Sequence, residues 1–83
     1  MNKQTIKTDL VNSSNIKALG YDAATRTMQV DFWIGSKYQY NPITLEAFHE
    51  LKNAESIGAH FNRHIKDNKL IDFICIQEKP VRK

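Results

Sequence analysis

The chain is poor in cysteine, proline and glycine, with one, two and three of these residues among its 83. The single cysteine, Cys75, excludes an intramolecular disulfide framework and a zinc site built on paired cysteines. So few prolines and glycines also exclude collagen-like and low-complexity chains. Because a small domain with a lone thiol is typical of a reducing compartment, we expect a cytoplasmic protein.

Long hydrophobic runs are missing too. The longest unbroken one, residues 73–76, is far shorter than the roughly 20 apolar residues that span a membrane, so we expect no contact with a bilayer. Residues 1–10 contain no apolar stretch of the kind found in secretory signals, and we expect them to form a flexible lead-in. A single domain is expected to cover residues 11–78, followed by a basic tail at residues 79–83.

Signatures of catalysis are absent as well. No glycine-rich phosphate loop or G-x-S-x-G nucleophile motif occurs, so we predict that the protein is not an enzyme and uses no cofactor. Cys75 lies in an apolar segment, where it is interpreted as a small buried hydrophobe. His60 and His64 have the spacing of two metal ligands on one helix, but the glutamate of the zinc-protease motif is missing, so we predict no metal site.

The pattern of hydrophobic residues predicts strands in the first half of the chain. From residue 28 to residue 34 apolar and polar side chains alternate, which is typical of a half-buried strand. We expect a preceding strand at residues 16–21 and a returning strand at residues 37–40, after a turn at Gly35-Ser36. Together these segments predict a three-stranded antiparallel meander.

After Pro42 the spacing of the hydrophobic residues becomes helical, in two segments that predict a helical hairpin packed on one face of the sheet. Thr44 and Ser56 stand where N-capping residues are expected. The predicted core positions are Leu45, Phe48 and Leu51 in the first helix and Ile57, Phe61 and Ile65 in the second.

The apolar segment at residues 70–76 predicts one more strand, because its aromatic and β-branched residues favour extended structure. Such a strand must either join the edge of the sheet or pair with a second copy of the chain, since a bare apolar edge promotes aggregation. The predicted fold class is therefore α+β: a three-stranded antiparallel meander, then a two-helix hairpin, with an additional C-terminal strand.

The length of the turn at Gly35-Ser36 decides which way the neighbouring aromatic side chains point. A two-residue turn places Trp33, Tyr38 and Tyr40 together on the outer face of the sheet, where they would form a platform for stacking bases. A three-residue turn pairs Ile34 with Tyr38 and Phe32 with Tyr40, so both tyrosines join the core and only the tryptophan stays outside. We favour the three-residue turn, because it keeps polar side chains off the core face.

Basic residues outnumber acidic ones by twelve to nine, which leaves a net charge of +3. This excess by itself is too small to establish a nucleic-acid partner. Some of the cations lie near the predicted aromatic surface, where they could contact a phosphate backbone. The candidate nucleic-acid-binding residues are Trp33, Tyr38, Tyr40, Lys17, Lys37, Arg63 and Lys66.

Two residues of the second predicted helix have open roles. Gly58 costs helix stability, about 1 kcal/mol relative to alanine, so we expect a strand or the first helix to approach it closely. Asn62 either donates a hydrogen bond to a loop carbonyl or meets a ligand.

An ordered set of residues points to a known family. It consists of Val11, Ser13-Ser14 and Leu19-Gly20-Tyr21-Asp22, then Met28-x-Val30-x-Phe32-x-x-Gly35-x-x-Tyr38-x-Tyr40, then Ala54-x-Ser56-x-Gly58-x-x-Phe61-Asn62-x-x-Ile65. From about residue 11 to residue 67, this set resembles the KTSC domain, which is marked by a central Y-x-Y. Residues 70–76 lie beyond the span of the family.

The resemblance implies a module that occurs at the C-terminus of some lysyl-tRNA synthetases and as small stand-alone bacterial and phage-type proteins. Its fusion to a synthetase implies an association with RNA, and it supplies no catalytic or metal-binding residues. We therefore predict a small non-catalytic module that binds RNA or another nucleic acid weakly through basic and aromatic surface residues. The alternative is a protein-interaction module, or a homodimer, that uses the strand at residues 70–76.

Overall fold

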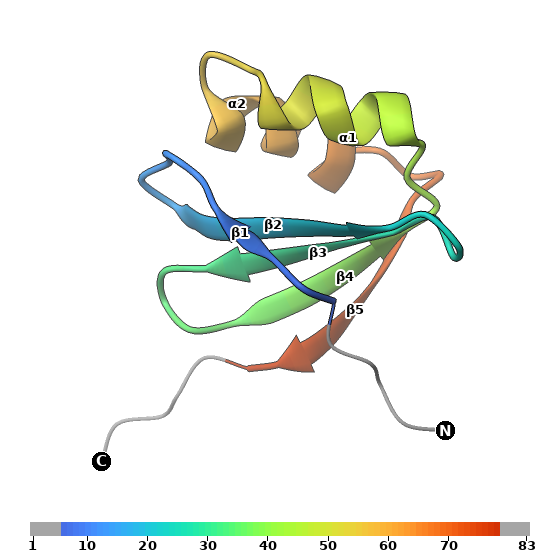
Figure 1. Cartoon of the computed structure of the whole chain (residues 1–83), viewed down its shortest axis with the longest axis horizontal. Coiled ribbons are helices and arrows are strands. Elements are labelled where there is room, and N and C mark those ends of the chain that lie inside the picture. Colours follow the sequence, from blue (N-terminus) through green and yellow to red (C-terminus); the bar gives the residue numbers. More distant parts are fainter. Residues whose placement is uncertain (1–5, 79–83) are drawn as a thin grey trace.

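The computed structural model describes residues 6–78 as an antiparallel sheet with all of its helices on one face (Figure 1). The five strands follow the order β1-β2-β3-β4-β5, so each strand pairs with its neighbours in the sequence. The helices are inserted between β4 and β5, which confirms the predicted α+β class. The elements are β1 (Asp9–Leu10), β2 (Ile16–Asp22), β3 (Thr27–Phe32), β4 (Lys37–Asn41), α1 (Leu45–Lys52), α2 (Ile57–Phe61), the π-helical turn η1 (Asn62–Lys66) and β5 (Asp72–Gln77).

The hydrophobic core lies between the sheet and the helices. The helices begin as predicted, because Thr44 Oγ1 accepts a hydrogen bond from the backbone N–H of Ala47 and Ser56 Oγ accepts one from Ala59. Leu45 is 47 % exposed, so its predicted core position was wrong: it occupies the first turn of α1, on the solvent side. The buried core consists of Ile16, Leu19, Met28, Val30, Tyr40, Ile43, Phe48, Leu51, Ile57, Phe61 and Ile65.

The β3–β4 hairpin adopts neither of the two expected registers. Val30 lies opposite Tyr38 and Met28 lies opposite Tyr40, because the turn occupies residues 33–35 and so begins two residues earlier than expected. It is closed by hydrogen bonds from the N–H of Gly35 to the carbonyl of Phe32 and from the N–H of Phe32 to the carbonyl of Ser36. A long-range contact accompanies this shift, since the N–H of Trp33 donates to the carbonyl of Asn15 rather than to β4. Nevertheless the tyrosines share the face of the core residues of β3, as in the favoured register. This is so because the observed register and the favoured one differ by an even number of residues.

Strand β5 resolves the alternative left open for the apolar segment at residues 70–76. It pairs with β4 of the same chain, with Tyr38 opposite Cys75 and Tyr40 opposite Phe73. Much of this segment stays exposed, because β5 forms the edge of the sheet; Leu70, Phe73 and Ile74 are all exposed.

The segment before β2 covers the sheet face that the helices leave open. We expected a lead-in through residue 10, but Asp9–Leu10 pairs with β2 as strand β1. Ahead of it, the N–H of Ile6 donates to Gln29 Oε1 over 2.9 Å, and the hydroxyl of Thr8 donates to Asp31 over 3.0 Å. Gln29 is fully buried and donates to Asp31 as well, over 2.8 Å, so this face carries a polar network. Residues 1–5 and 79–83, the rest of the expected lead-in and tail, lie outside the described residues.

The contact between this segment and β2 depends on Gly20. A Cβ atom built there would approach the carbonyl oxygen of Lys7 to 2.2 Å and a methyl carbon of Thr8 to 2.9 Å. We therefore expect Gly20→Ala to displace the segment and to lower the free energy of unfolding by about 1–3 kcal/mol, measured by urea denaturation. Gly58→Ala is the matched control, because the nearest atom to its Cβ, Asn15 Nδ2, lies 3.7 Å away.

The control variant should be as stable as the unchanged chain or up to about 1 kcal/mol more stable, owing to the helix propensity of alanine. The close approach that we expected at Gly58 is thus not present, and the residue borders an open space instead. Equal stability of the two alanine variants would contradict the packing of residues 6–8 on β2. No helix within residues 6–78 is long and apolar enough to cross a membrane.

Candidate functional site

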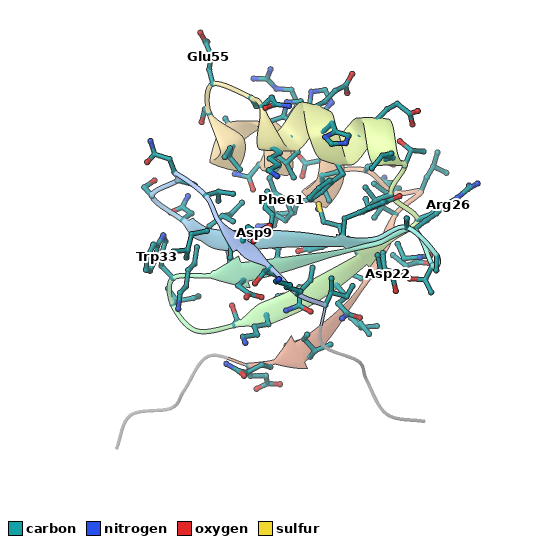
Figure 2. The ribbon with its side chains drawn as sticks, in the orientation of Figure 1. Asp9, Asp22, Arg26, Trp33, Glu55 and Phe61 are labelled. Atoms are coloured by element: carbon teal, nitrogen blue, oxygen red, sulfur yellow. The ribbon has the colours of Figure 1, made fainter. Side chains whose placement is uncertain are left out.

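A groove of about 690 Å³ opens between the helical layer and strands β3, β4 and β5. Phe61 projects from α2 toward the sheet, and Trp33 extends from the turn between β3 and β4 (Figure 2). Because β5 runs antiparallel to β4, Phe73 lies near the end of the groove that is farther from this turn. The aromatic side chains that line the groove are Phe32, Trp33, Tyr38, Tyr40, Phe61 and Phe73.

The rings inside the groove form one connected surface. Phe61 contacts Tyr40 and Phe32 edge to face, with ring centroids 5.2 Å and 5.9 Å apart. On the β5 side, Phe73 lies 5.8 Å from Tyr38 and 6.0 Å from Tyr40 between ring centroids. Edge-to-face and offset contacts of this kind stabilise ring orientations, so the groove has a preformed aromatic floor.

The two ends of the groove expose aromatic rings to solvent. Phe73 is 63 % exposed and Trp33 is 55 % exposed, whereas Tyr40 between them is buried. Trp33 is held in place, since its indole N–H donates to the carbonyl of Ser13 over 3.0 Å. The ammonium of Lys17 lies 5.7 Å from the centre of its ring, at cation–π distance. Each end therefore offers an apolar ring, and the turn end offers a positive charge beside it.

Polar groups border the groove on the helical side. The turn η1 supplies both Asn62 and Lys66, and both side chains are exposed. Between them Ile65 is buried, which fixes the turn against the core. The wide π-helical geometry is closed by a hydrogen bond from the N–H of Asp67 to the carbonyl of Asn62. Single π-helical turns occur frequently at functional sites.

Both tyrosines of the groove are neutral at physiological pH. Burial raises the pKa of Tyr40 to about 12, and the neighbouring Tyr38 and Cys75 act in the same direction. Cys75, opposite Tyr38 on β5, raises the pKa of Tyr38 through its charge when ionised and through a hydrogen bond. The phenols can therefore exchange hydrogen bonds with a ligand, but they supply no charge or base.

The structure brings together five of the seven candidate residues and leaves two apart. Trp33, Tyr38, Tyr40 and Lys66 all line the groove, and Lys17 lies beside the first of them. Two candidates lie elsewhere. Lys37 stands opposite Asp31 in the β3–β4 register, on the sheet face that residues 6–8 cover. Arg63 is exposed on η1, outside the lining of the groove.

The roles of Phe61 and Phe73 in this site were not predicted from the sequence. Phe61 was assigned to the core, where it indeed lies, but one side of its ring also closes the groove. Phe73 was placed in a strand without a known partner. The alternation of Phe73 and Cys75 mirrors that of Tyr38 and Tyr40, and this pattern becomes informative only when β5 is known to pair with β4.

The two spaced histidines lie at a second, smaller hollow of about 360 Å³, which adjoins the aromatic groove at Ile65 and Ile71. The ring centroids of His60 and His64 are 4.3 Å apart. Burial and the adjacent His64 lower the pKa of His60, so its ring is neutral at physiological pH. Across residues 6–78, no three side chains of His, Cys, Asp or Glu come together in a group that could hold a metal ion.

Comparison with known proteins settles the family. The sequence model of the KTSC domain matches residues 12–68. The chain belongs to the KTSC domain family. A KTSC domain protein of Yersinia pestis has the same fold in its crystal structure, with a TM-score of 0.72, 29 % identity, and coverage of 89 % of this chain and 99 % of that one.

Two further relatives show where KTSC domains occur. An uncharacterized protein of Stutzerimonas stutzeri is 36 % identical over 56 residues, which is 68 % of this chain and 79 % of the relative. A lysine–tRNA ligase of Nostoc punctiforme is 40 % identical over 53 residues, which is 64 % of this chain but 9 % of the ligase. The similarity to the ligase is thus confined to a small segment of that enzyme.

Proposed function

We propose that this KTSC domain is a small non-catalytic module of the cytoplasm that binds single-stranded RNA in its aromatic groove. The observation that supports the proposal most is the preformed aromatic floor with exposed rings at both ends and cations beside it. Single-stranded nucleic acids are bound in this way, by stacking of bases on aromatic side chains and by basic groups that follow the backbone.

The electrostatics of the groove favour an anionic ligand. Its lining contains Lys66 and no acidic residue among the described side chains, and Lys17 lies at the turn end. The whole chain carries a net charge of +3. The affinity for RNA should therefore fall as salt is added. A plot of the logarithm of the association constant against the logarithm of the salt concentration should have a slope of about −0.7 for each phosphate that is neutralised.

The relatives favour RNA over other anionic chains. Lysine–tRNA ligases act on tRNA, and a segment of these enzymes is similar to this domain. This similarity is the reason to propose RNA rather than another polyanion as the ligand of the groove.

Trp33→Ala is expected to weaken binding of a mixed-sequence single-stranded RNA by about tenfold or more, because stacking of one base is worth about 1–3 kcal/mol. The measurement is fluorescence anisotropy of a labelled RNA of about ten nucleotides at low and moderate salt. Leu45→Ala is the control, since this exposed leucine lies on α1 outside the groove.

The control variant should bind as tightly as the unchanged protein. An affinity that does not depend on salt, or no binding below about 100 µM, would speak against RNA as the ligand. Equal affinities of the two alanine variants would place the RNA away from the turn end of the groove.

A second candidate function follows from the open edge of the sheet. We propose as the alternative that β5 pairs with a strand of another protein or of a second copy. No charged residue interrupts β5 between Asp72 and Gln77, and Ile74 is 49 % exposed on it. Proteins usually protect such edges with charges, bulges or proline.

Ile74→Lys is expected to abolish association through this edge, because a lysine on an edge strand opposes pairing with another strand. The molar mass in solution, measured by light scattering over a range of concentrations, would fall from that of a dimer to that of a monomer. Leu45→Lys, at a similarly exposed leucine on α1, should leave the mass unchanged. A monomer at every concentration, before and after substitution, would exclude self-association.

A further inference from the structure

We propose that the groove holds RNA at two separate stacking points, Trp33 at the turn end and Phe73 at the far end, and that its ligand is an unpaired run of nucleotides long enough to reach both. This inference rests on the proposed function, because it states what length of RNA the aromatic groove selects. It starts from the unequal exposure of the rings. Trp33 is 55 % exposed and Phe73 is 63 % exposed, and both line the groove.

The rings between these two points offer little open surface to a base. Tyr40 and Phe61 are 6 % and 3 % exposed, and they contact each other edge to face. Phe32 and Tyr38 are half-buried, the first against Phe61 and the second against Phe73. A base stacks on an open ring face, so the stacking surface of the groove is divided between its two ends.

The first point, Trp33, is already fixed in the free protein. Its indole N–H donates to the carbonyl of Ser13 over 3.0 Å, and its backbone N–H donates to the carbonyl of Asn15 over 3.1 Å. The ammonium of Lys17 lies 5.7 Å from the centre of its ring, where it can also contact the phosphate of a stacked nucleotide. A ring that is held in one orientation loses little freedom on binding, so Trp33 should contribute the larger share of the affinity.

The second point, Phe73, owes its position to the pairing of β5 with β4. Its ring packs against Tyr38 and Tyr40, with centroids 5.8 Å and 6.0 Å apart. Because β5 is the edge strand, no further strand of residues 6–78 lies beyond it (Figure 1). The ring is therefore supported on one side by the tyrosines and is open to water on most of its remaining surface.

The strand register separates the two points. Phe73 lies opposite Tyr40 on β4, and Tyr40 lies opposite Met28 on β3. Phe32, which precedes Trp33, follows Met28 by four residues. With a rise of about 3.4 Å per residue and about 4.8 Å between strands, the Cα atoms of Phe32 and Phe73 are about 16 Å apart. Nucleotides of a stacked strand are about 3.4 Å apart, so such a strand needs about six nucleotides to reach both rings, and a strand with splayed bases needs fewer.

Lys66 suits the phosphates that link the two stacked bases. Its side chain is exposed on η1 at the border of the groove, and the described lining contains no acidic residue. Once one base is stacked, the tethered second base meets the other ring at a high effective concentration. An RNA that spans the groove should therefore bind more tightly than its additional phosphates alone would explain.

The first test is a series of single-stranded RNAs of about two to about ten nucleotides, measured by fluorescence anisotropy at one salt concentration. The affinity should rise in a step of about tenfold or more between about three and about six nucleotides. Phe73→Ala should remove the step, so that long RNAs bind about tenfold more weakly while a dinucleotide changes less than about twofold. Leu70→Ala, at a leucine that is 85 % exposed outside the lining of the groove, should keep the step.

The second test removes bases from an RNA of about six nucleotides without changing its charge. An abasic nucleotide at either end should weaken binding by about tenfold, whereas abasic nucleotides in the middle should weaken it less than about twofold. In Phe73→Ala the base at one end should become dispensable, and in Trp33→Ala the base at the other end. The pair of variants thus also gives the direction of the strand in the groove.

The outcomes separate this inference from the proposal that underlies it. A smooth rise of affinity with length, unchanged in Phe73→Ala, would overturn the two-point contact and leave RNA binding in place if Trp33→Ala still weakens it. Equal losses from middle and end bases would also overturn the two-point contact. No binding of any length by the unchanged protein would overturn the proposed function itself. Both variants should remain folded in thermal unfolding, since both rings are mostly exposed.

Discussion

Replacing Phe61 by alanine is expected to lower the free energy of unfolding by about 3–5 kcal/mol. The side chain is 3 % exposed and its ring contacts those of Phe32 and Tyr40, so its removal leaves a cavity between α2 and the sheet. A domain of this size is stabilised by about 5–10 kcal/mol in total. The variant should therefore unfold at a much lower urea concentration than the unchanged chain, as followed by circular dichroism.

Phe73→Ala provides the matched control for this substitution. Phe73 also contacts Tyr40, with ring centroids 6.0 Å apart, but it is 63 % exposed on the edge strand. Since most of its surface is already in water, its loss should cost about 1 kcal/mol. A large loss of stability in both variants would mean that Phe73 is covered in solution. A small loss in both would mean that the core does not extend to Phe61.

Raising the pH from about 10 to about 12 is expected to destabilise the fold by up to about 2–3 kcal/mol through Tyr40 alone. The pKa of Tyr40 is raised from 10.0 to about 12 in the folded chain, chiefly because burial disfavours the phenolate. The folded state thus holds the proton more tightly than the unfolded state. This contribution to stability is fully present below pH 10 and is lost as the pH rises through the folded pKa.

The measurement is urea denaturation at a series of alkaline pH values, and Tyr40→Phe is the control. Phenylalanine keeps the ring that contacts Phe61 and removes the group that ionises. The variant should lose less stability over this interval than the unchanged chain does. A residual fall in the free energy of unfolding is expected from Tyr38, whose pKa is also raised in the folded chain. Identical pH dependence of the two proteins would show that Tyr40 is open to water in the folded state.

Local patterns were enough to predict strands β2 to β5 and the helical segments, but not strand β1. The alternation from Met28 to Phe32 and the helical spacing of Phe48, Leu51 and the later core residues are properties of neighbouring positions. The caps at Thr44 and Ser56 also depend only on residues three positions away. At these positions the strand and the helices were confirmed, because the physical cause of each lies within one turn or one strand. The expectation of a half-buried strand was wrong, since Gln29 and Asp31 are buried under residues 6–8.

The hairpin register shows where local reasoning ends. The turn follows Phe32 directly, two residues earlier than its sequence indicates, and its first residue, Trp33, bonds to Asn15, which is far away in the chain. The covering of the sheet by residues 6–8 has the same kind of cause, since it depends on Gln29 and Asp31 in another strand. Neither hydrogen bond leaves a signal in the residues next to it.

The candidate site is divided in the same way. Residue types and the Y-x-Y motif were sufficient to select Trp33, Tyr38, Tyr40 and Lys66 as binding candidates, and to assign the chain to its family. The pairing of β5 with β4 decided that Phe73 stands beside the two tyrosines, and the packing of α2 decided that Phe61 lies opposite them. A groove requires surfaces from several elements at once, so its shape follows from long-range pairing and packing. The types of the side chains that line it, in contrast, can be identified from short segments of the sequence.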